Sequence, residues 1–183
     1  MNVQGVIKSV LTGLFLLVVT TGNAGARDMA VTNLEGYGEG AVLGIENVNT
    51  VGFVSVTYTG EGKSTVLGKF DFLAKLAVRW DTPLPNGSGG YCAPASGYST
   101  HEMRDKSTVV LNFTGIFCEA GQQAFATETL PQHMPAPPFT YTGTYLIADG
   151  TGRFSGVSGS GSMTGHTDTN LKLTVIIDGK IIH

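Results

Sequence analysis

The chain has 183 residues, of which 14% are charged, and its 11 Lys and Arg against 14 Asp and Glu give a formal net charge of −3. It contains no basic run or patch, so nothing electrostatic points to nucleic acid as a partner. Its 26 glycines and its many Ser and Thr residues are typical of strands and turns rather than helices. The length suits one domain.

Residues 1–26 are typical of a secretory signal peptide. Lys8 precedes an apolar core at residues 10–19, and residues 24–26 (Ala-Gly-Ala) have the small-x-small pattern of a cleavage site, so cleavage is expected before Arg27. The alternative is a membrane anchor, but a spanning helix takes about 20 apolar residues and this core is about half as long. The expected mature chain, residues 27–183, is one domain that is secreted or periplasmic, with no membrane as a partner after cleavage.

The first strands are predicted at residues 41–45 and 52–59, with a turn at 60–63. From residue 65 to 81 the even positions are all apolar or glycine: Val66, Gly68, Phe70, Phe72, Ala74, Leu76, Val78 and Trp80. Most of the odd positions are charged, so one face of this run is expected to be buried (the dry face) and the other exposed to solvent. The run is either two strands or one long strand bent at a glycine. Long strands with one dry face are typical of a closed or nearly closed antiparallel barrel.

Residues 82–100 carry Pro, Gly and Ser clusters without periodicity and are predicted to form a long loop. A second irregular stretch is expected at 130–139, and a hairpin turn at 178–179. Further strands are expected at residues 107–117, 122–129, 140–148, 160–164 and 171–177. The pattern gives seven or eight strands and no helix, so the fold class is all-β.

Two cysteines, Cys92 and Cys118, occur in a chain that is expected to leave the reducing cytosol. An even count in an exported protein indicates a disulfide. The alternative is a catalytic thiol, but no His or Asn is placed so as to single out either cysteine. A disulfide would tie the predicted loop at residues 82–100 to the strand at 107–117.

A glycine-rich turn at residues 150–159 (GTGRFSGVSG) is expected to bury Phe154 in the core. It lacks the Lys-Ser/Thr of a P-loop, and no helix follows it. The turn resembles a motif of dirigent proteins, plant allene oxide cyclases and many exported bacterial barrel proteins, and residues 63–70 (KSTVLGKF) resemble a strand of the bacterial members. This resemblance implies a single eight-stranded antiparallel β-barrel with an apolar cavity. It also implies a homo-oligomer, as in many of the plant proteins.

The resemblance carries over no catalytic residue, because Ser158 stands where dirigent proteins keep a basic residue and nothing matches the acidic group of the cyclases. The candidate ligand-binding residues are therefore those that could line the cavity. Phe70, Phe72 and Trp80 share the dry face of the alternating run, where small neighbours leave room for a ligand. Arg153, inside the turn motif, either faces that ligand or hydrogen-bonds carbonyl groups of its own loop.

One metal-ligating pattern is present. His166 and Asp168 are two residues apart and would share a face of a strand. A third ligand would have to come from residues at no diagnostic spacing: His101, Glu102, His133 or His183. The sequence therefore predicts no metal site and no cofactor.

The leading hypothesis is a secreted or periplasmic barrel that binds a small apolar molecule, or has a structural role, without catalysis. The alternative from the enzyme class is an isomerase or cyclase, or a dirigent-like guide, whose cavity restricts the conformers of a small apolar substrate. A third hypothesis is an outer-membrane barrel with its charges in the lumen: Lys69, Asp71, Lys75 and Arg79. Aromatic girdles and evenly spaced ten-residue strands, which such barrels carry, are missing from the sequence.

Overall fold

The computed structural model describes residues 29–49, 52–81, 83–119 and 137–183. The predicted signal peptide and the predicted strand at 122–129 lie outside these residues. The strands are β1 (Val31–Asn49), β2 (Phe53–Ser64), β3 (Gly68–Arg79), β4 (Leu84–Pro85), β5 (Tyr91–Met103), β6 (Thr108–Glu119), β7 (Phe139–Gly150), β8 (Ser158–Thr167) and β9 (Lys172–Ile182). One 3-10 turn, η1 (Gly152–Phe154), separates β7 from β8. Among the described residues, no helix has the length and apolar character needed to cross a membrane.

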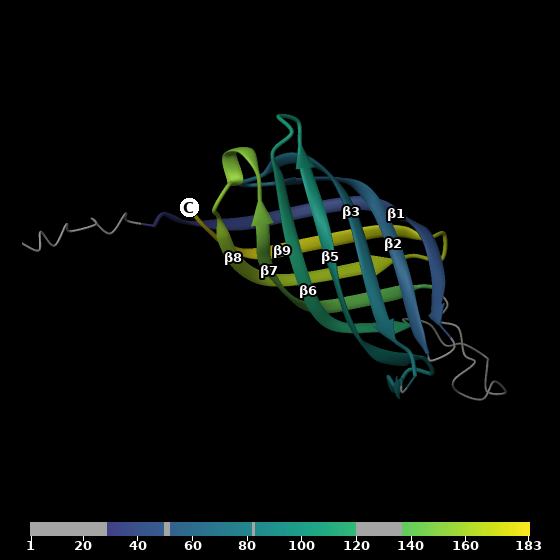
Figure 1. Ribbon diagram of the computed structural model, residues 1–183. Coiled ribbons are helices and arrows are strands. Elements are labelled where there is room, and N and C mark those ends of the chain that lie inside the picture. The colour runs from purple at the N-terminus through teal and green to yellow at the C-terminus, as the bar shows by residue number, and fades with distance from the viewer. Residues whose placement is uncertain (1–28, 50–51, 82, 120–136) are drawn as a thin grey trace, which may run out of the picture.

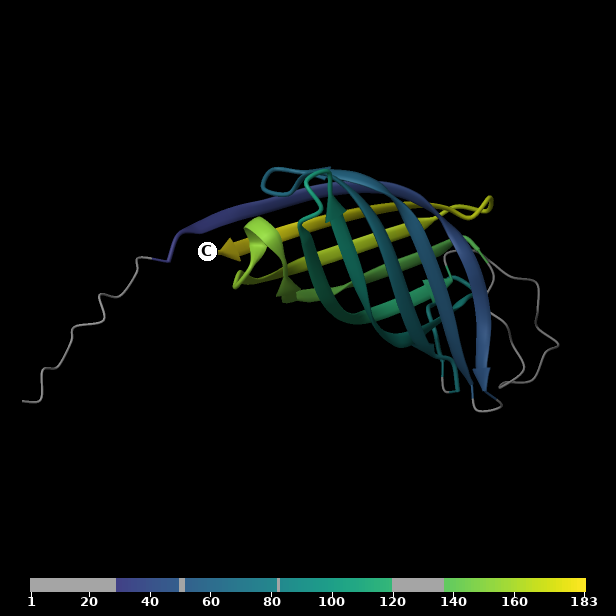
Figure 2. The same ribbon diagram turned by 45° about the horizontal axis from the view of Figure 1, so that its top comes forward.

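Eight of the strands form a closed antiparallel barrel, which confirms the predicted fold (Figure 1). The order around the ring is β3, β2, β1, β9, β8, β7, β6, β5, and pairing of β5 with β3 closes it. Successive strands of the ring pair with each other, and β1, the first of them, lies beside β9, the last, so the barrel is of the up-and-down type (Figure 2). β4 pairs only with β5 and lies outside the ring.

The alternating run forms β3 and the turn before it. The dry positions are buried inside the barrel: Phe70, Phe72, Leu76, Val78 and Trp80. The charged positions between them are exposed outside: Lys69, Asp71, Lys75 and Arg79. The charges that the outer-membrane hypothesis placed in a lumen therefore point away from the interior.

The long loop predicted at residues 82–100 is wrong, because β4 and most of β5 occupy this stretch. The inward positions of this part of β5 hold small side chains: Ala93, Ala95, Gly97 and Ser99. Because these small residues differ little in hydropathy from the polar residues between them, the period-two alternation that marks a strand is weak in this sequence. Pro94 is tolerated because it lies opposite Ile116 of β6, while on its other side it falls between the segments that pair with β3 and with β4.

The turns predicted at residues 60–63 and 178–179 are also wrong, because β2 and β9 continue through them. Two glycine pairs lie directly opposite each other across neighbouring strands: Gly40 with Gly60, and Gly161 with Gly179. A Cβ added at Gly60 would lie 2.1 Å from the carbonyl oxygen of Glu39. Glycine is required here by the close approach of two backbones, not by a turn.

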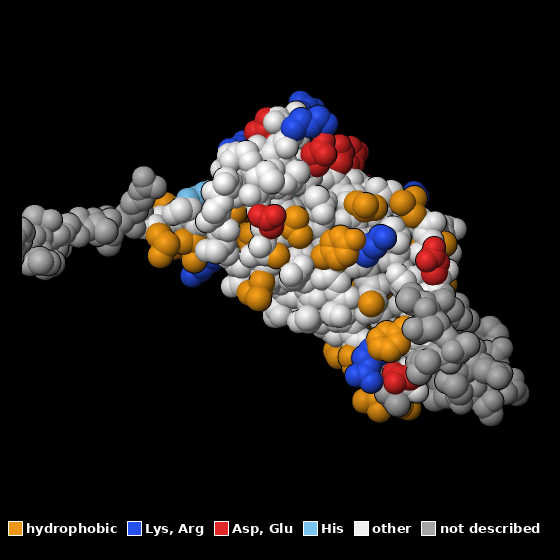
Figure 3. Space-filling view, in the orientation of Figure 1, with side chains coloured by type: hydrophobic (Ala, Val, Ile, Leu, Met, Phe, Trp, Pro, Cys, Tyr) orange, Lys and Arg blue, Asp and Glu red, His pale blue; other side chains and the backbone are white. Residues whose placement is uncertain are grey.

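Charged side chains gather over the turn between β5 and β6, while the remaining visible face carries few of them (Figure 3). Four carboxylates occupy directly opposite positions across β1, β2, β3 and β5: Glu39, Glu61, Asp71 and Glu102. Like charges in such positions destabilise a sheet. Lys106 offsets part of this repulsion, since its ammonium group lies 2.5 Å from a carboxylate oxygen of Glu102.

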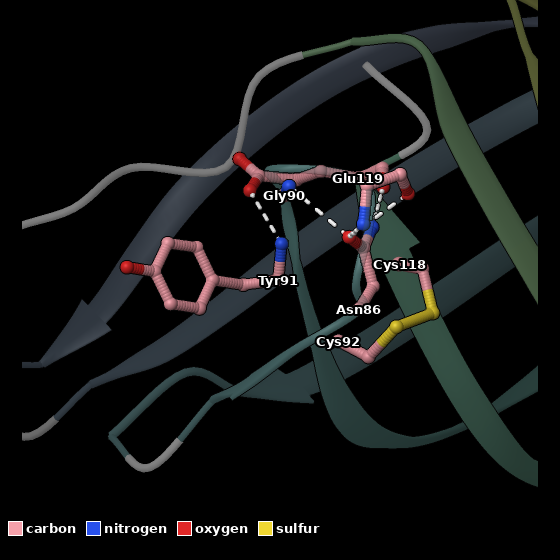
Figure 4. Close-up of a disulfide and its surroundings, with 7 residues drawn as sticks. Asn86, Gly90, Tyr91, Cys92, Cys118 and Glu119 are labelled. Atoms are coloured by element: carbon pink, nitrogen blue, oxygen red, sulfur yellow. Dashed lines mark hydrogen bonds between the residues drawn. A yellow bond between two sulfur atoms is a disulfide. The ribbon is translucent and has the colours of Figure 1, made fainter. Parts of the chain in front are cut away.

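Cys92 and Cys118 form the predicted disulfide, with an S–S distance of 2.01 Å, between opposite positions of β5 and β6 (Figure 4). Beside it, Asn86 follows β4 and connects this segment to the end of β6. Its side-chain amide donates to the carbonyl oxygen of Glu119 at 2.6 Å, and its Oδ1 accepts from the N–H of Gly90 at 3.1 Å. A disulfide is compatible with an extracellular or periplasmic protein.

At one end of the barrel, Arg153 connects three turns. Its Nη2 donates to the carbonyl oxygen of Leu67, in the turn between β2 and β3, at 2.8 Å. Its Nε lies 3.4 Å from a carboxylate oxygen of Asp105, in the turn between β5 and β6. Its guanidinium carbon lies 4.7 Å from the ring centre of Phe154, which is buried as predicted. The carbonyl group that Arg153 binds therefore belongs to a neighbouring turn rather than to its own.

Replacing Arg153 with alanine is expected to lower the free energy of unfolding by about 1–2 kcal/mol, because a charge-assisted hydrogen bond and a cation–π contact are lost. Urea unfolding of the wild type and of Arg153→Ala measures this loss. Arg153→Lys is the matched control, since it keeps the charge but not the planar guanidinium, and should recover only part of the stability. Full recovery of stability by Arg153→Lys would show that the positive charge alone accounts for the contribution of Arg153.

Candidate functional site

The interior of the barrel contains a cavity with a mainly apolar lining. The cavity has a volume of about 60 Å³, several times the roughly 10–15 Å³ that a single water needs. All eight strands of the ring contribute to the lining, and its large apolar side chains include Phe70, Phe72, Leu76, Phe113, Phe139 and Ile177. No Asp, Glu, Lys or Arg of the described residues belongs to the lining.

His101 is the one histidine among the lining residues, and its pKa is strongly perturbed. It lies on β5, directly opposite Phe72 of β3 and Val109 of β6, and only 4% of its surface is exposed. Its ring centre is 4.7 Å from that of Phe70 and 6.2 Å from that of Phe72. Its Nε2 lies 2.8 Å from the hydroxyl oxygen of Ser99, two residues earlier on the same inward face.

Burial lowers the pKa of His101 to about 4, so the ring is neutral at neutral pH. Its other nitrogen, Nδ1, is buried and has no hydrogen-bond partner among the described residues. The hydroxyl of Tyr141, a further lining residue, is also buried without such a partner. Burial raises the pKa of Tyr141 to about 12, so this phenol stays protonated. The mainly apolar lining thus contains two uncharged, buried polar groups that have no hydrogen-bond partner among the described residues.

Of the predicted ligand-binding residues, Phe70 and Phe72 line the cavity. Trp80 is buried elsewhere, with its ring edge-on to Phe117 at 6.2 Å between ring centres. Arg153 lies among the turns at one end of the barrel and is not among the lining residues. The sequence did not predict the hydrogen-bonding pair formed by Ser99 and His101, although their period-two spacing was a signal, because the predicted loop at residues 82–100 includes Ser99.

The predicted His-x-Asp pair is not brought together with other ligands. His166 is exposed on β8, and Oδ1 of Asp168 accepts from the N–H groups of Asn170 and Lys172 at 2.8 and 2.9 Å in the turn before β9. Within the described segments, no three His, Cys, Asp or Glu side chains are grouped so as to hold a metal ion. His133, one of the proposed third ligands, lies outside those segments.

Comparisons of the chain with protein-family models, with curated proteins and with solved structures find no match. The likeness of the turn motif to the dirigent and allene oxide cyclase barrels therefore stays a prediction from the sequence.

Proposed function

We propose that this protein is secreted or periplasmic, after cleavage before Arg27, and that it binds a small, mostly apolar molecule inside its barrel. The observation that supports this most is the apolar cavity, because a well-packed interior has few voids larger than a water molecule. Apolar enclosure with a few polar groups is the usual form of a small-molecule site. The disulfide supports export.

Native mass spectrometry of the protein purified from the exported fraction of its own host tests this proposal. We expect a bound mass below that of a typical drug molecule, which is released on denaturation. A molecule lost during purification would be replaced by methylcyclohexane, whose binding is followed by chemical-shift changes of the cavity residues. A protein that carries no bound mass and does not bind methylcyclohexane would contradict the proposal.

Filling the cavity at Gly165 is expected to remove the bound molecule while leaving the barrel folded. Gly165 belongs to the lining on β8, and a Cβ added there would meet Tyr141 at 3.6 Å and Leu173 at 3.8 Å, which are ordinary contacts. Gly165→Val therefore occupies ligand space without a backbone clash. The matched control is Gly44→Val on β1, outside the lining, where an added Cβ meets nothing within 4 Å. If Gly165→Val and Gly44→Val carried equal amounts of the bound molecule, the molecule would not occupy the cavity beside Gly165.

The second candidate function is an isomerase or cyclase related to the dirigent and allene oxide cyclase barrels. The pair of Ser99 and His101 inside the cavity favours it, since His is the commonest general base. Against this, the lowered pKa of His101 makes the ring a weak base. Incubation with the ligand released from the native protein distinguishes the two functions, because an isomerase would return a molecule of equal mass and different retention time.

A further inference from the structure

His101 places one unpaired polar atom in apolar surroundings. Nδ1 is buried without a partner among the described residues, and the ring is flanked by Phe70 and Phe72. A buried polar atom left unpaired is costly, and native proteins keep few of them. A ligand that pairs with Nδ1 removes this cost when it enters the cavity.

Ser99 decides whether Nδ1 donates or accepts. The Ser99 hydroxyl is buried, and His101 Nε2 is its partner at 2.8 Å among the described residues. A hydroxyl always has one hydrogen to donate, and here that hydrogen is satisfied only when Ser99 donates to Nε2. Nε2 then accepts, and the hydrogen of the neutral ring sits on Nδ1. Nδ1 is consequently a donor.

We propose that the ligand of the barrel is uncharged and that it carries an oxygen that accepts a hydrogen bond from Nδ1–H of His101. This inference rests on the proposed function of the cavity and names the class of molecule it holds: a compact apolar skeleton with a carbonyl, ether or hydroxyl oxygen. A charged ligand is disfavoured because the described lining contains no ionised side chain to pair with it. Ser99 acts as the positioning residue, since it fixes the ring tautomer.

Calorimetric titration of the full chain with two matched probes tests the inference. Cyclohexanone offers an acceptor oxygen, and methylcyclohexane has a similar shape without one. We expect His101→Phe to weaken the binding of cyclohexanone about tenfold and to leave that of methylcyclohexane within about twofold. Tyr141→Phe, which removes the other unpaired group of the lining, should leave the ratio of the two affinities at its wild-type value.

The possible outcomes distinguish a failure of the inference about His101 from a failure of the proposed ligand-binding function. If the wild type binds neither probe, the proposed function fails. If His101→Phe changes both affinities equally, or if Tyr141→Phe alone weakens cyclohexanone, the barrel still binds apolar molecules but the role of His101 is wrong.

A second measurement needs no substitution at His101. Nitrogen-15 spectra of the wild type are expected to show the hydrogen on Nδ1, with a shift that moves on addition of cyclohexanone and stays fixed with methylcyclohexane. Ser99→Ala should lose this tautomer preference, which a merely structural role of Ser99 would leave in place. A ring that carries its hydrogen on Nε2 in the wild type would overturn the inference.

Discussion

Loss of the disulfide between Cys92 and Cys118 is expected to lower the free energy of unfolding by about 3–4 kcal/mol. The bond joins residues separated by 26 positions, and it removes the corresponding loop-closure entropy from the unfolded chain. It also lies beside the point where β4 and Asn86 are held against β5 and β6. Urea unfolding of the oxidised protein and of the double variant Cys92→Ala/Cys118→Ala measures the loss.

The position of the disulfide gives this experiment an internal control. Neither cysteine belongs to the cavity lining, so the double variant should keep the bound molecule while it is folded. The loss should also equal that seen on adding reductant to the wild type. A change below about 1 kcal/mol would mean that the unfolded chain keeps β5 near β6 without the bond.

The barrel could be predicted where large apolar residues alternate with charges. In the run that forms β3, Phe70 and Phe72 alternate with Lys69 and Asp71, and each side chain lies on the face that its period predicts. The prediction failed in β5, because alternation between Ala, Gly and Ser hardly differs in hydropathy from a loop. It failed again at Gly60, where glycine serves the close approach of two backbones rather than a turn.

The cavity could be predicted only in part, for a different physical reason. Phe70 and Phe72 were identified from their own strand, since facing inward is a local property. The surroundings of His101 depend on the register of β5 with β3, which sets Phe72 opposite the imidazole ring across almost 30 residues of chain. No spacing in the sequence encodes that pairing. Polar groups of a site converge in space in this way, and their burial is known only once the sheet has closed.

Acidification from pH 7 to pH 4 is expected to destabilise the wild type by about 3 kcal/mol more than the variant His101→Gln. The pKa of His101 is about 4 in the folded protein, against 6.5 for an exposed histidine. Between these values the unfolded chain binds a proton that the folded protein does not, so stability falls as the pH falls, by about 1.4 kcal/mol per pH unit. The loss begins near pH 6.5 and levels off below pH 4. Urea unfolding at pH 7, 6, 5 and 4 measures it.

The difference in acid-induced loss of stability between the wild type and His101→Gln reports on His101 alone, because all other ionisable groups are present in both proteins. The other ionisable residues of the lining are Tyr37, Tyr58 and Tyr141. The pKa of each is raised, by the hydrogen bond to Glu39 for Tyr37 and by burial for the other two, so none of them changes charge in this range. His166→Gln, at an exposed position of β8, is the matched control and should keep the full acid loss, because it retains His101. Parallel curves for the wild type and His101→Gln would mean that the imidazole accepts its proton without unfolding. The cavity would then hold a charged imidazolium in the folded barrel, and the uncharged site on which ligand selection by His101 depends would not exist.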